Sequence, residues 1–205
     1  MLLKKVVVEF MQALKLLLSF APWLAFLLIA HDSLLRVKIG LVVAFVLSIV
    51  LGAAKVNRGL VLWTSLIFFA FAAVSVVALN NLWTVRYMGV LANGTLAAVM
   101  WLSVLAGKPF TLEYAKEHAA PSLWKSAAFL RVNNIIASVW GASLTLNAAM
   151  AFVKMRTQPA PEVAYDVVSY ATLLGAVAFT TWYPGFVHRK AAAANEASKV
   201  AAEAK

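Results

Sequence analysis

The chain has 205 residues, of which 63% are hydrophobic and 13% are charged, whereas soluble domains carry about 25% charged residues. Its apolar residues form long blocks, which excludes a single soluble core and predicts an all-α integral membrane protein, a bundle of six transmembrane helices. The net charge of +10 comes from Lys and Arg at the ends of these blocks, where membrane topology explains it, so the bilayer and not nucleic acid is the expected partner. The absence of cysteine excludes disulfides and thiolate metal sites.

Six blocks approach the roughly 20 residues that a helix needs to cross the hydrocarbon layer. In chain order the predicted spans are 11–30, 37–54, 59–79, 83–106, 132–153 and 163–187. Pro22 should kink the first span, whereas Pro184 and Gly185 should end the last one. The first block could also be a cleaved signal peptide, but a retained helix is favoured because the cleavage site before His31 is poor and the following sequence is equally apolar.

A cytoplasmic interfacial segment, residues 107–131, is predicted between the fourth and fifth spans because aromatic and charged residues are interspersed there. Pro109 should end the preceding helix, and Thr111 should cap a short helix that carries Glu113 in its first turn. Ser122 should cap a second short helix. The Ala-rich residues 188–205 predict a short cytoplasmic helical tail.

The basic residues predict the orientation of the bundle. Of the 18 Lys and Arg residues, the side opposite the termini holds Arg36, Lys38, Arg86, Lys154 and Arg156. The remaining 13 lie on the side of both termini, which is therefore cytoplasmic under the positive-inside rule.

Small residues form a stripe on the second span at successive i,i+4 positions: Gly40, Ala44, Ser48 and Gly52. Such stripes let helix backbones approach closely in lipid. The favoured interpretation is tight packing within one chain, and the alternative is the seam of a homo-oligomer. Trp23 and Trp140 are expected to lie deeper than the other tryptophans and to pack inside the bundle.

Polar residues mark one face of the fifth span, at Asn134, Ser138 and Thr145, and the middle of the fourth span, at Asn93 and Thr95. Polar side chains at membrane depth must face protein or water. Two interpretations stay open: hydrogen bonds between helices, which are favoured, and a path for a solute.

Catalytic and metal-binding patterns are missing from the sequence. No ionisable residue occupies the centre of a predicted span, although Arg86 and Asp166 could pair near the outer helix ends. His118 and His188 are expected to be ordinary interfacial residues and not metal ligands. No phosphate loop, nucleophile elbow or H-E-x-x-H helix is present, so neither a cofactor, a metal nor an enzyme activity is expected.

Four short motifs carry a family resemblance: Phe20-Ala-Pro-Trp-Leu-Ala-Phe26, Lys55-Val-Asn-Arg58, Asn81-Leu-Trp-Thr-Val-Arg-Tyr87 and Leu105-Ala-Gly-Lys-Pro-Phe-Thr111. Through them, about half of the chain resembles the intracellular septation protein A family. The resemblance implies a bacterial inner-membrane protein linked to envelope or division processes, without known catalysis. The chain departs from that family by its last two helices and its tail, and it lacks the charged run before the fourth helix.

Three functions are compatible with these features. The leading hypothesis is a non-enzymatic accessory or structural subunit of the inner membrane. The second is a small transporter or channel that uses the polar faces of the fourth and fifth spans. The third is a lipid-modifying enzyme that would use Glu113, Glu117 and His118 at the cytoplasmic face.

Overall fold

The computed structural model describes residues 18–30, 33–56, 59–117, 119–157 and 162–203, and over these ranges it is helical without any strand. Five helical segments are long and apolar enough to cross a membrane: Leu34–Ala53, Gly59–Ala78, Met88–Leu105, Ala127–Arg156 and Val163–Ala194. An all-α architecture with five helices that could span a membrane is therefore shown for this part of the chain. Residues 11–17 of the first predicted span lie outside the described residues.

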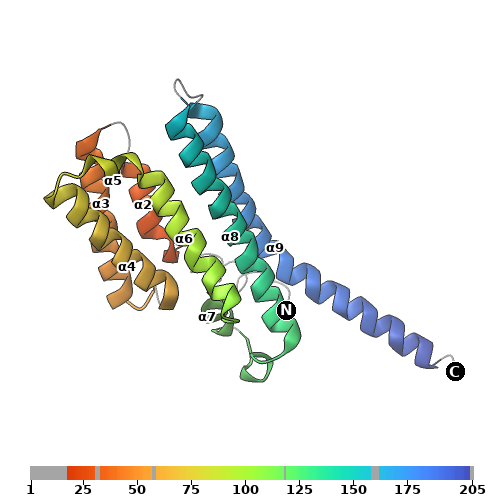
Figure 1. The fold of residues 1–205 in the computed structure, drawn as a ribbon. Helices are drawn as coiled ribbons and strands as arrows, with labels where there is room; N and C mark the ends of the chain where they lie inside the picture. The colour runs from red at the N-terminus through yellow and green to blue at the C-terminus, as the bar shows by residue number, and fades with distance from the viewer. Residues whose placement is uncertain (1–17, 31–32, 57–58, 118, 158–161, 204–205) are drawn as a thin grey trace.

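The helices follow one another in an up-and-down order (Figure 1). In chain order the elements are α2 (Ala21–Ile29), α3 (Leu34–Ala53), α4 (Gly59–Ala73), the π-helical turn η1 (Val74–Ala78), α5 (Leu82–Arg86), α6 (Met88–Leu105), α7 (Thr111–Lys116), the 3-10 turn η2 (Pro121–Leu123), α8 (Ala127–Arg156) and α9 (Glu162–Glu203). The end of α3, α7 and the start of α8 lie at one end of the bundle, which we call the α7 end (Figure 1). The start of α3, α5, the end of α8 and the start of α9 lie at the opposite end (Figure 1).

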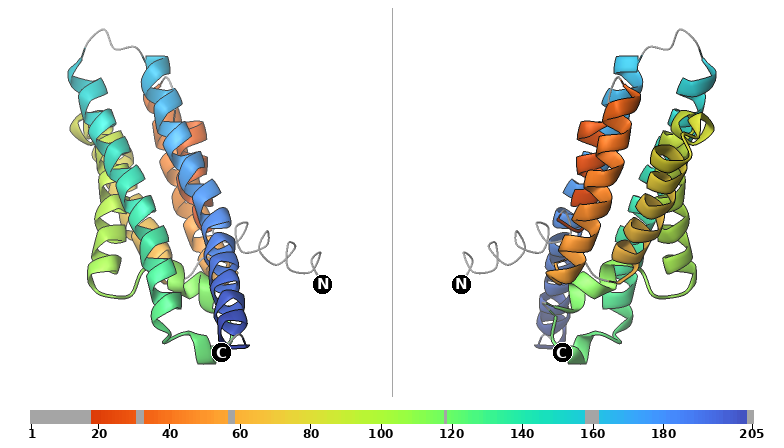
Figure 2. Two further views of the ribbon diagram at one scale, coloured as in Figure 1. Left: turned by 90° about the vertical axis from the view of Figure 1, so that its right-hand side faces the viewer. Right: turned by 90° about the vertical axis from the view of Figure 1, so that its left-hand side faces the viewer.

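The bundle has two groups of helices. One group is α2, α3 and α4, and the other is α6, α8 and α9, with α4 packing on α6 between them (Figure 1). In the side views, α6 and α8 lie in one layer, and α2, α3 and α9 lie in the other (Figure 2). In the second group α8 is central, because it packs against α6, α7 and α9. The main neighbour of α9 is α8.

Aromatic side chains pack within the first group and also reach from it to the second. The ring of Trp23 lies 4.9 Å from that of Phe68 and 4.7 Å from that of Phe69, and its indole Nε1 donates a hydrogen bond of 2.7 Å to Ser65 Oγ. Phe20 stacks on Trp140 of α8 at 5.1 Å. The predicted deep position of Trp23 and Trp140 is confirmed, since both are buried.

The fourth predicted span is not one helix. Asn81 caps the short α5, because its Oδ1 accepts hydrogen bonds from the backbone N–H groups of Trp83 and Thr84. Tyr87 then separates α5 from α6. The fifth span is longer than expected because Ser126 caps α8 well before Val132, accepting a hydrogen bond from the Phe129 N–H.

The prediction that Pro184 and Gly185 end the last helix is wrong. Helix α9 runs through both residues and includes most of the tail that was expected to be separate. A proline removes one backbone hydrogen bond, but the alanines that follow favour helix strongly enough to continue it. Helix α9 changes direction about half-way along (Figure 1), as expected for an internal proline.

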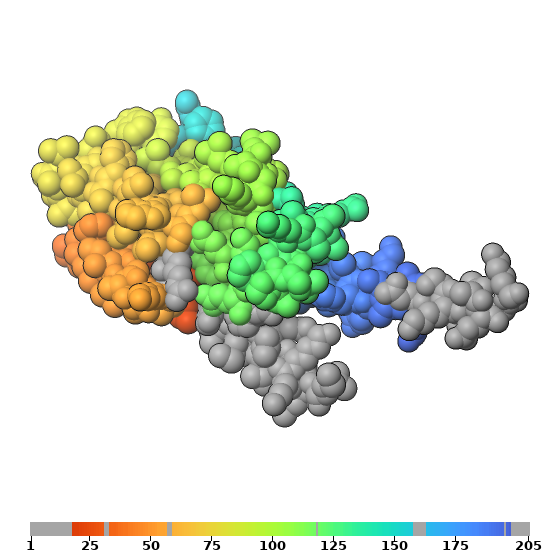
Figure 3. All heavy atoms as spheres, turned by 90° about the horizontal axis from the view of Figure 1, so that it is seen from below, coloured from red at the N-terminus to blue at the C-terminus, as the bar shows by residue number. Residues whose placement is uncertain are grey.

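The segment 107–131 is partly built into the bundle and does not lie flat on a surface. Pro109, Phe110 and Leu112 are buried, and α6 ends before Gly107, whose φ of +68° suits a helix-terminating glycine. Thr111 does not cap α7: its Oγ1 instead donates a hydrogen bond of 3.1 Å to the Asn133 carbonyl of α8. Viewed from the α7 end, this segment lies between the α3–α4 part of the bundle and α9 (Figure 3).

Candidate functional site

The small-residue stripe of α3 faces other helices of the same chain. A Cβ on Gly40 would meet Ala30 Cβ at 3.3 Å, next to α2, and a Cβ on Gly52 would meet Leu62 of α4 at 2.9 Å. Between them Ala44 and Ser48 are fully buried. The stripe is thus occupied within the chain by α2 and α4, as the favoured interpretation expects.

The five predicted polar residues do not come together around one channel. Asn93 donates a hydrogen bond to the Gly89 carbonyl of its own helix, and Thr95 is partly exposed on the same helix. Thr145 donates to the Gly141 carbonyl and accepts a hydrogen bond of 3.1 Å from Trp101 Nε1.

Helices α6 and α8 close against each other where a path would have to run. The indole of Trp101 lies over Gly141, so that a Cβ on this glycine would be 2.9 Å from the ring. Beside this contact, Asn134 and Ser138 line an open hollow on the surface of α8 together with Trp101. The Oδ1 atom of Asn134 is buried there without a hydrogen-bond partner.

The polar interior lies instead between α8 and α9, on residues that the sequence pattern did not single out as a site. Trp140 Nε1 donates a hydrogen bond of 3.0 Å to Thr180 Oγ1, and Thr172 Oγ1 donates one of 3.0 Å to Asn147 Oδ1. Asn147 also donates to the Ser169 carbonyl at 3.4 Å. These bonds hold α9 onto α8 from the middle of the bundle toward the end away from α7.

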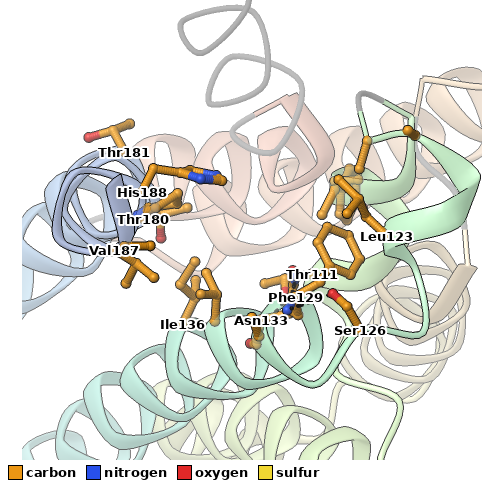
Figure 4. A pocket seen from close by; sticks show the side chains of 18 residues that line it. Thr111, Leu123, Ser126, Phe129, Asn133, Ile136, Thr180, Thr181, Val187 and His188 are labelled. Carbon is orange, nitrogen blue, oxygen red and sulfur yellow. Dashed lines mark hydrogen bonds between the residues drawn. The ribbon is translucent and has the colours of Figure 1, made fainter. Parts of the chain in front are cut away.

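Nearer to the α7 end, α8 and α9 separate around a cavity of about 450 Å³ (Figure 4). Its third wall is formed by α7, η2 and the residues between them. The walls are mainly apolar, including Leu123, Phe129, Val132, Ile136, Pro184 and Val187. Small-molecule sites in proteins typically have volumes of about 300 to 1,000 Å³, and this cavity lies in that range.

Polar groups of the cavity wall are already engaged in the fold. Asn133 donates to the Phe129 carbonyl, and Thr180 and Thr181 donate to carbonyls of their own helix. Burial raises the pKa of Tyr114 to about 12, with the Ser19 hydroxyl acting in the opposite direction. The phenol is therefore neutral near pH 7, and these groups form no nucleophile–base pair.

Glu113 serves the fold at the start of α4. Its carboxylate lies against Gly59, where an added Cβ would overlap it, and Gly59 has a φ of +59°. A carboxylate at a helix N-terminus is favoured by the helix dipole. Burial raises the pKa of Glu113, while the nearby Lys116 opposes the shift.

The proposed lipid-modifying trio is not assembled by these contacts. Glu113 packs on α4, Glu117 is exposed at the end of α7, and His118 lies outside the described residues. Among the residues that the structure describes, no group of three His, Asp or Glu side chains could hold a metal ion. The suggested pairing of Asp166 with Arg86 is replaced by an ion pair of 3.0 Å with Lys154.

Basic residues flank the cavity in the chain. Lys125 precedes the lining residue Ser126, whereas Arg189 and Lys190 follow the lining residue His188. All three cations are exposed. The cavity thus combines an apolar interior with a basic surrounding at one end of the bundle.

Comparisons with protein-family models, with curated proteins and with solved structures found no match for this chain. The resemblance to the septation protein A family therefore stays a prediction.

Proposed function

We propose that this chain is a non-enzymatic accessory or structural subunit of a membrane, which associates with another membrane protein or a second copy of itself through α9. The observation that carries the proposal is the isolation of this helix. Only 6% of its apolar span is buried, against 22% to 44% in the other four spans.

The exposed side of α9 also has the residues that close helix contacts need. Ala164, Ala171, Gly175 and Ala178 are spaced along one face and are exposed, and nothing lies within 4 Å of a Cβ built on Gly175. A glycine inside a helix costs about 0.5 to 1 kcal/mol relative to alanine. In lipid, small residues allow the close backbone approach that drives helix association.

The proposed location is a bacterial inner membrane, with both termini in the cytoplasm. The support for the location is the family resemblance, and the support for the orientation is the excess of Lys and Arg at the α7 end and in the terminal segments. Transport along α6 and α8 is the weaker alternative, because Trp101 fills the space over Gly141.

Cross-linking of single cysteines tests the proposal, and the chain has no native cysteine to interfere. Leu174→Cys on α9 and Ile67→Cys on α4 form a matched pair, since both side chains are 68% exposed. The two positions lie at similar depth. Leu174 is about a dozen residues after Glu162, where α9 begins, and Ile67 is about a dozen residues before Ala78, where η1 ends, and both of these ends lie away from α7. In native membranes treated with a bifunctional maleimide or an oxidant, we expect adducts from Leu174→Cys and none from Ile67→Cys.

The mass of the adduct distinguishes a second copy from a different membrane protein. Adding Gly175→Leu to the Leu174→Cys chain should abolish the adduct, because the larger side chain keeps a partner helix away. Equal adduct yields at both cysteines, or no adduct at either, would contradict the proposal.

A further inference from the structure

The cavity at the α7 end lies between α8 and α9 and is bounded on the side facing the middle of the bundle. On its inner side Trp140 and Thr180 bind each other across α8 and α9, and Ile136 lies on the wall beneath them. In Figure 4 the side chains of Ile136 and Val187 project into the space between the helices.

An apolar occupant suits the interior of this cavity. Apolar side chains dominate the wall, and the hydroxyl of Thr180 and the amide of Asn133 already donate to backbone carbonyls. Burying a polar occupant without hydrogen-bond partners would be unfavourable, whereas a hydrocarbon chain leaves no polar group of these residues newly unpaired. The surrounding bilayer supplies hydrocarbon chains of this kind.

The mouth suits a negatively charged headgroup. Lys125, Arg189 and Lys190 are exposed cations that neighbour the lining residues Ser126 and His188 along the chain. The apolar run of α9 ends before His188, Arg189 and Lys190, which places these cations near a membrane surface. Basic clusters at such a position attract anionic lipid headgroups.

We propose that the cavity binds one acyl chain of an anionic phospholipid, whose phosphate is held by Lys125, Arg189 and Lys190. The hydroxyl of Ser126 and the imidazole of His188 lie on the lining and provide further polar contacts for the headgroup. This lipid site goes beyond the association through α9 and does not depend on it.

Electron paramagnetic resonance with spin-labelled lipids tests the proposal directly. The full-length protein is reconstituted in phosphatidylcholine vesicles that contain a trace of phosphatidylglycerol or phosphatidylcholine, each labelled near the end of one acyl chain. With the wild-type protein, we expect a larger motionally restricted fraction for phosphatidylglycerol than for phosphatidylcholine. Equal fractions would overturn the proposal. A preference for phosphatidylglycerol that survives filling of the cavity would also overturn it, since anionic lipids attracted to the basic surface of the protein need no cavity.

Filling the cavity from either wall tests whether the cavity binds an acyl chain. Ala128→Phe on α8 and Ala191→Phe on α9 each place a ring in the space and should reduce the restricted phosphatidylglycerol fraction to the phosphatidylcholine level. Ala149→Phe and Ala193→Phe add the same volume at exposed positions of the same helices outside the lining and should leave it unchanged. Two filling variants are used so that the test still holds if one of them does not fold.

Removing the cations tests the headgroup part. The triple variant Lys125→Gln, Arg189→Gln and Lys190→Gln should abolish the preference for phosphatidylglycerol, whereas Arg86→Gln at the opposite end should retain it. If the filling variants instead change the oligomeric state while the restricted lipid fraction stays constant, the cavity is a protein contact and the proposal is wrong.

Discussion

At the scale of single residues, the contact between Glu113 and Gly59 shows how α7 is tied to the bundle. The carboxylate lies at the first residue of α4, and burial raises its pKa above the usual value of 4.5. The folded protein therefore binds this proton more tightly than the unfolded chain does. Stability from the protonated side chain is present below pH 4.5 and is lost as the pH rises through the folded-state pKa.

The pH dependence of thermal stability checks this contribution. Between about pH 4 and about pH 7, the melting temperature of the wild-type protein in detergent should fall more steeply with rising pH than that of Glu113→Gln. The glutamine keeps the shape of the contact but does not titrate. Glu196→Gln removes the same charge from an exposed position of α9 and should keep the wild-type slope. Parallel curves for wild type and Glu113→Gln would refute the assignment.

A second residue-scale prediction concerns the close approach of α6 and α8. Gly141→Ala should lower the free energy of unfolding by about 1 to 3 kcal/mol, because its Cβ would press on the Trp101 ring. Gly94→Ala on α6 has open space at its Cβ and should raise the same quantity by about 0.5 to 1 kcal/mol. Denaturation in mixed micelles measures both. A neutral or stabilising Gly141→Ala would mean that the two helices leave room for a path.

Neighbouring asparagines show the limit of sequence analysis at this scale. The helical spacing grouped Asn134 with Ser138 and Thr145, yet Asn133 is the buried residue, whose carbonyl accepts the hydrogen bond from Thr111. One position along a helix turns a side chain by about 100°. Which of two adjacent polar residues faces the core depends on the helices that pack around it, and these contacts are not local in sequence.

At the scale of elements, α9 depends on hydrogen bonds to α8 because it has few other contacts. Trp140 donates to Thr180 across the two helices, and the indole is buried. Hydrogen bonds between membrane helices stabilise a bundle by about 0.5 to 2 kcal/mol each. Losing this one leaves a buried donor without a partner, which is unfavourable.

A double-mutant cycle measures this bond. Thr180→Val and Trp140→Phe should each lower the free energy of unfolding, and their coupling energy should be about 0.5 to 1.5 kcal/mol. Thr181→Val is the matched control, since the side chain of Thr181 is exposed and donates only to the Ala178 carbonyl of its own helix. Additive effects of the first two substitutions would show that the indole and the hydroxyl do not interact in the membrane.

Helix boundaries were predictable only where a local signal decided them. Ser126 and Asn81 are ordinary cap residues that a closer reading of side-chain chemistry could have found. The helix end predicted at Pro184 was wrong because an internal proline is tolerated where strong helix formers follow it. The π-helical turn η1 has no comparable signal, since Val74–Ala78 reads as ordinary apolar helix.

At the scale of the whole molecule, the alternation of long helices separates two ends. The turn η2 and the last part of α9 lie at the α7 end, whereas α5 and the end of α8 lie at the other (Figure 1). Segment length and apolar composition were enough to predict this alternation for the five spans that the structure describes. They could not predict which helices touch, because lipid and protein are equally good surroundings for apolar side chains.

Labelling of single cysteines in sealed vesicles checks the alternation. A membrane-impermeant maleimide should react with Ser122→Cys and Ala193→Cys from one side, and with Leu82→Cys and Thr157→Cys from the other. All four should react once detergent opens the vesicles. With vesicles of known orientation, the first pair should be cytoplasmic. Reaction of Ser122→Cys and Thr157→Cys from the same side would contradict the up-and-down order.

Because α9 continues past Pro184, the part of the helix beyond the bend extends away from the bundle (Figure 1). Each helical residue adds about 1.5 Å, so the helix from Pro184 to Glu203 reaches about 28 Å beyond the bend. A small rotation of the lower part of α9 at Pro184 is magnified into a larger sideways movement of its tip. A molecule bound in the cavity, which Pro184 lines, would therefore influence the direction of the C-terminal part of α9.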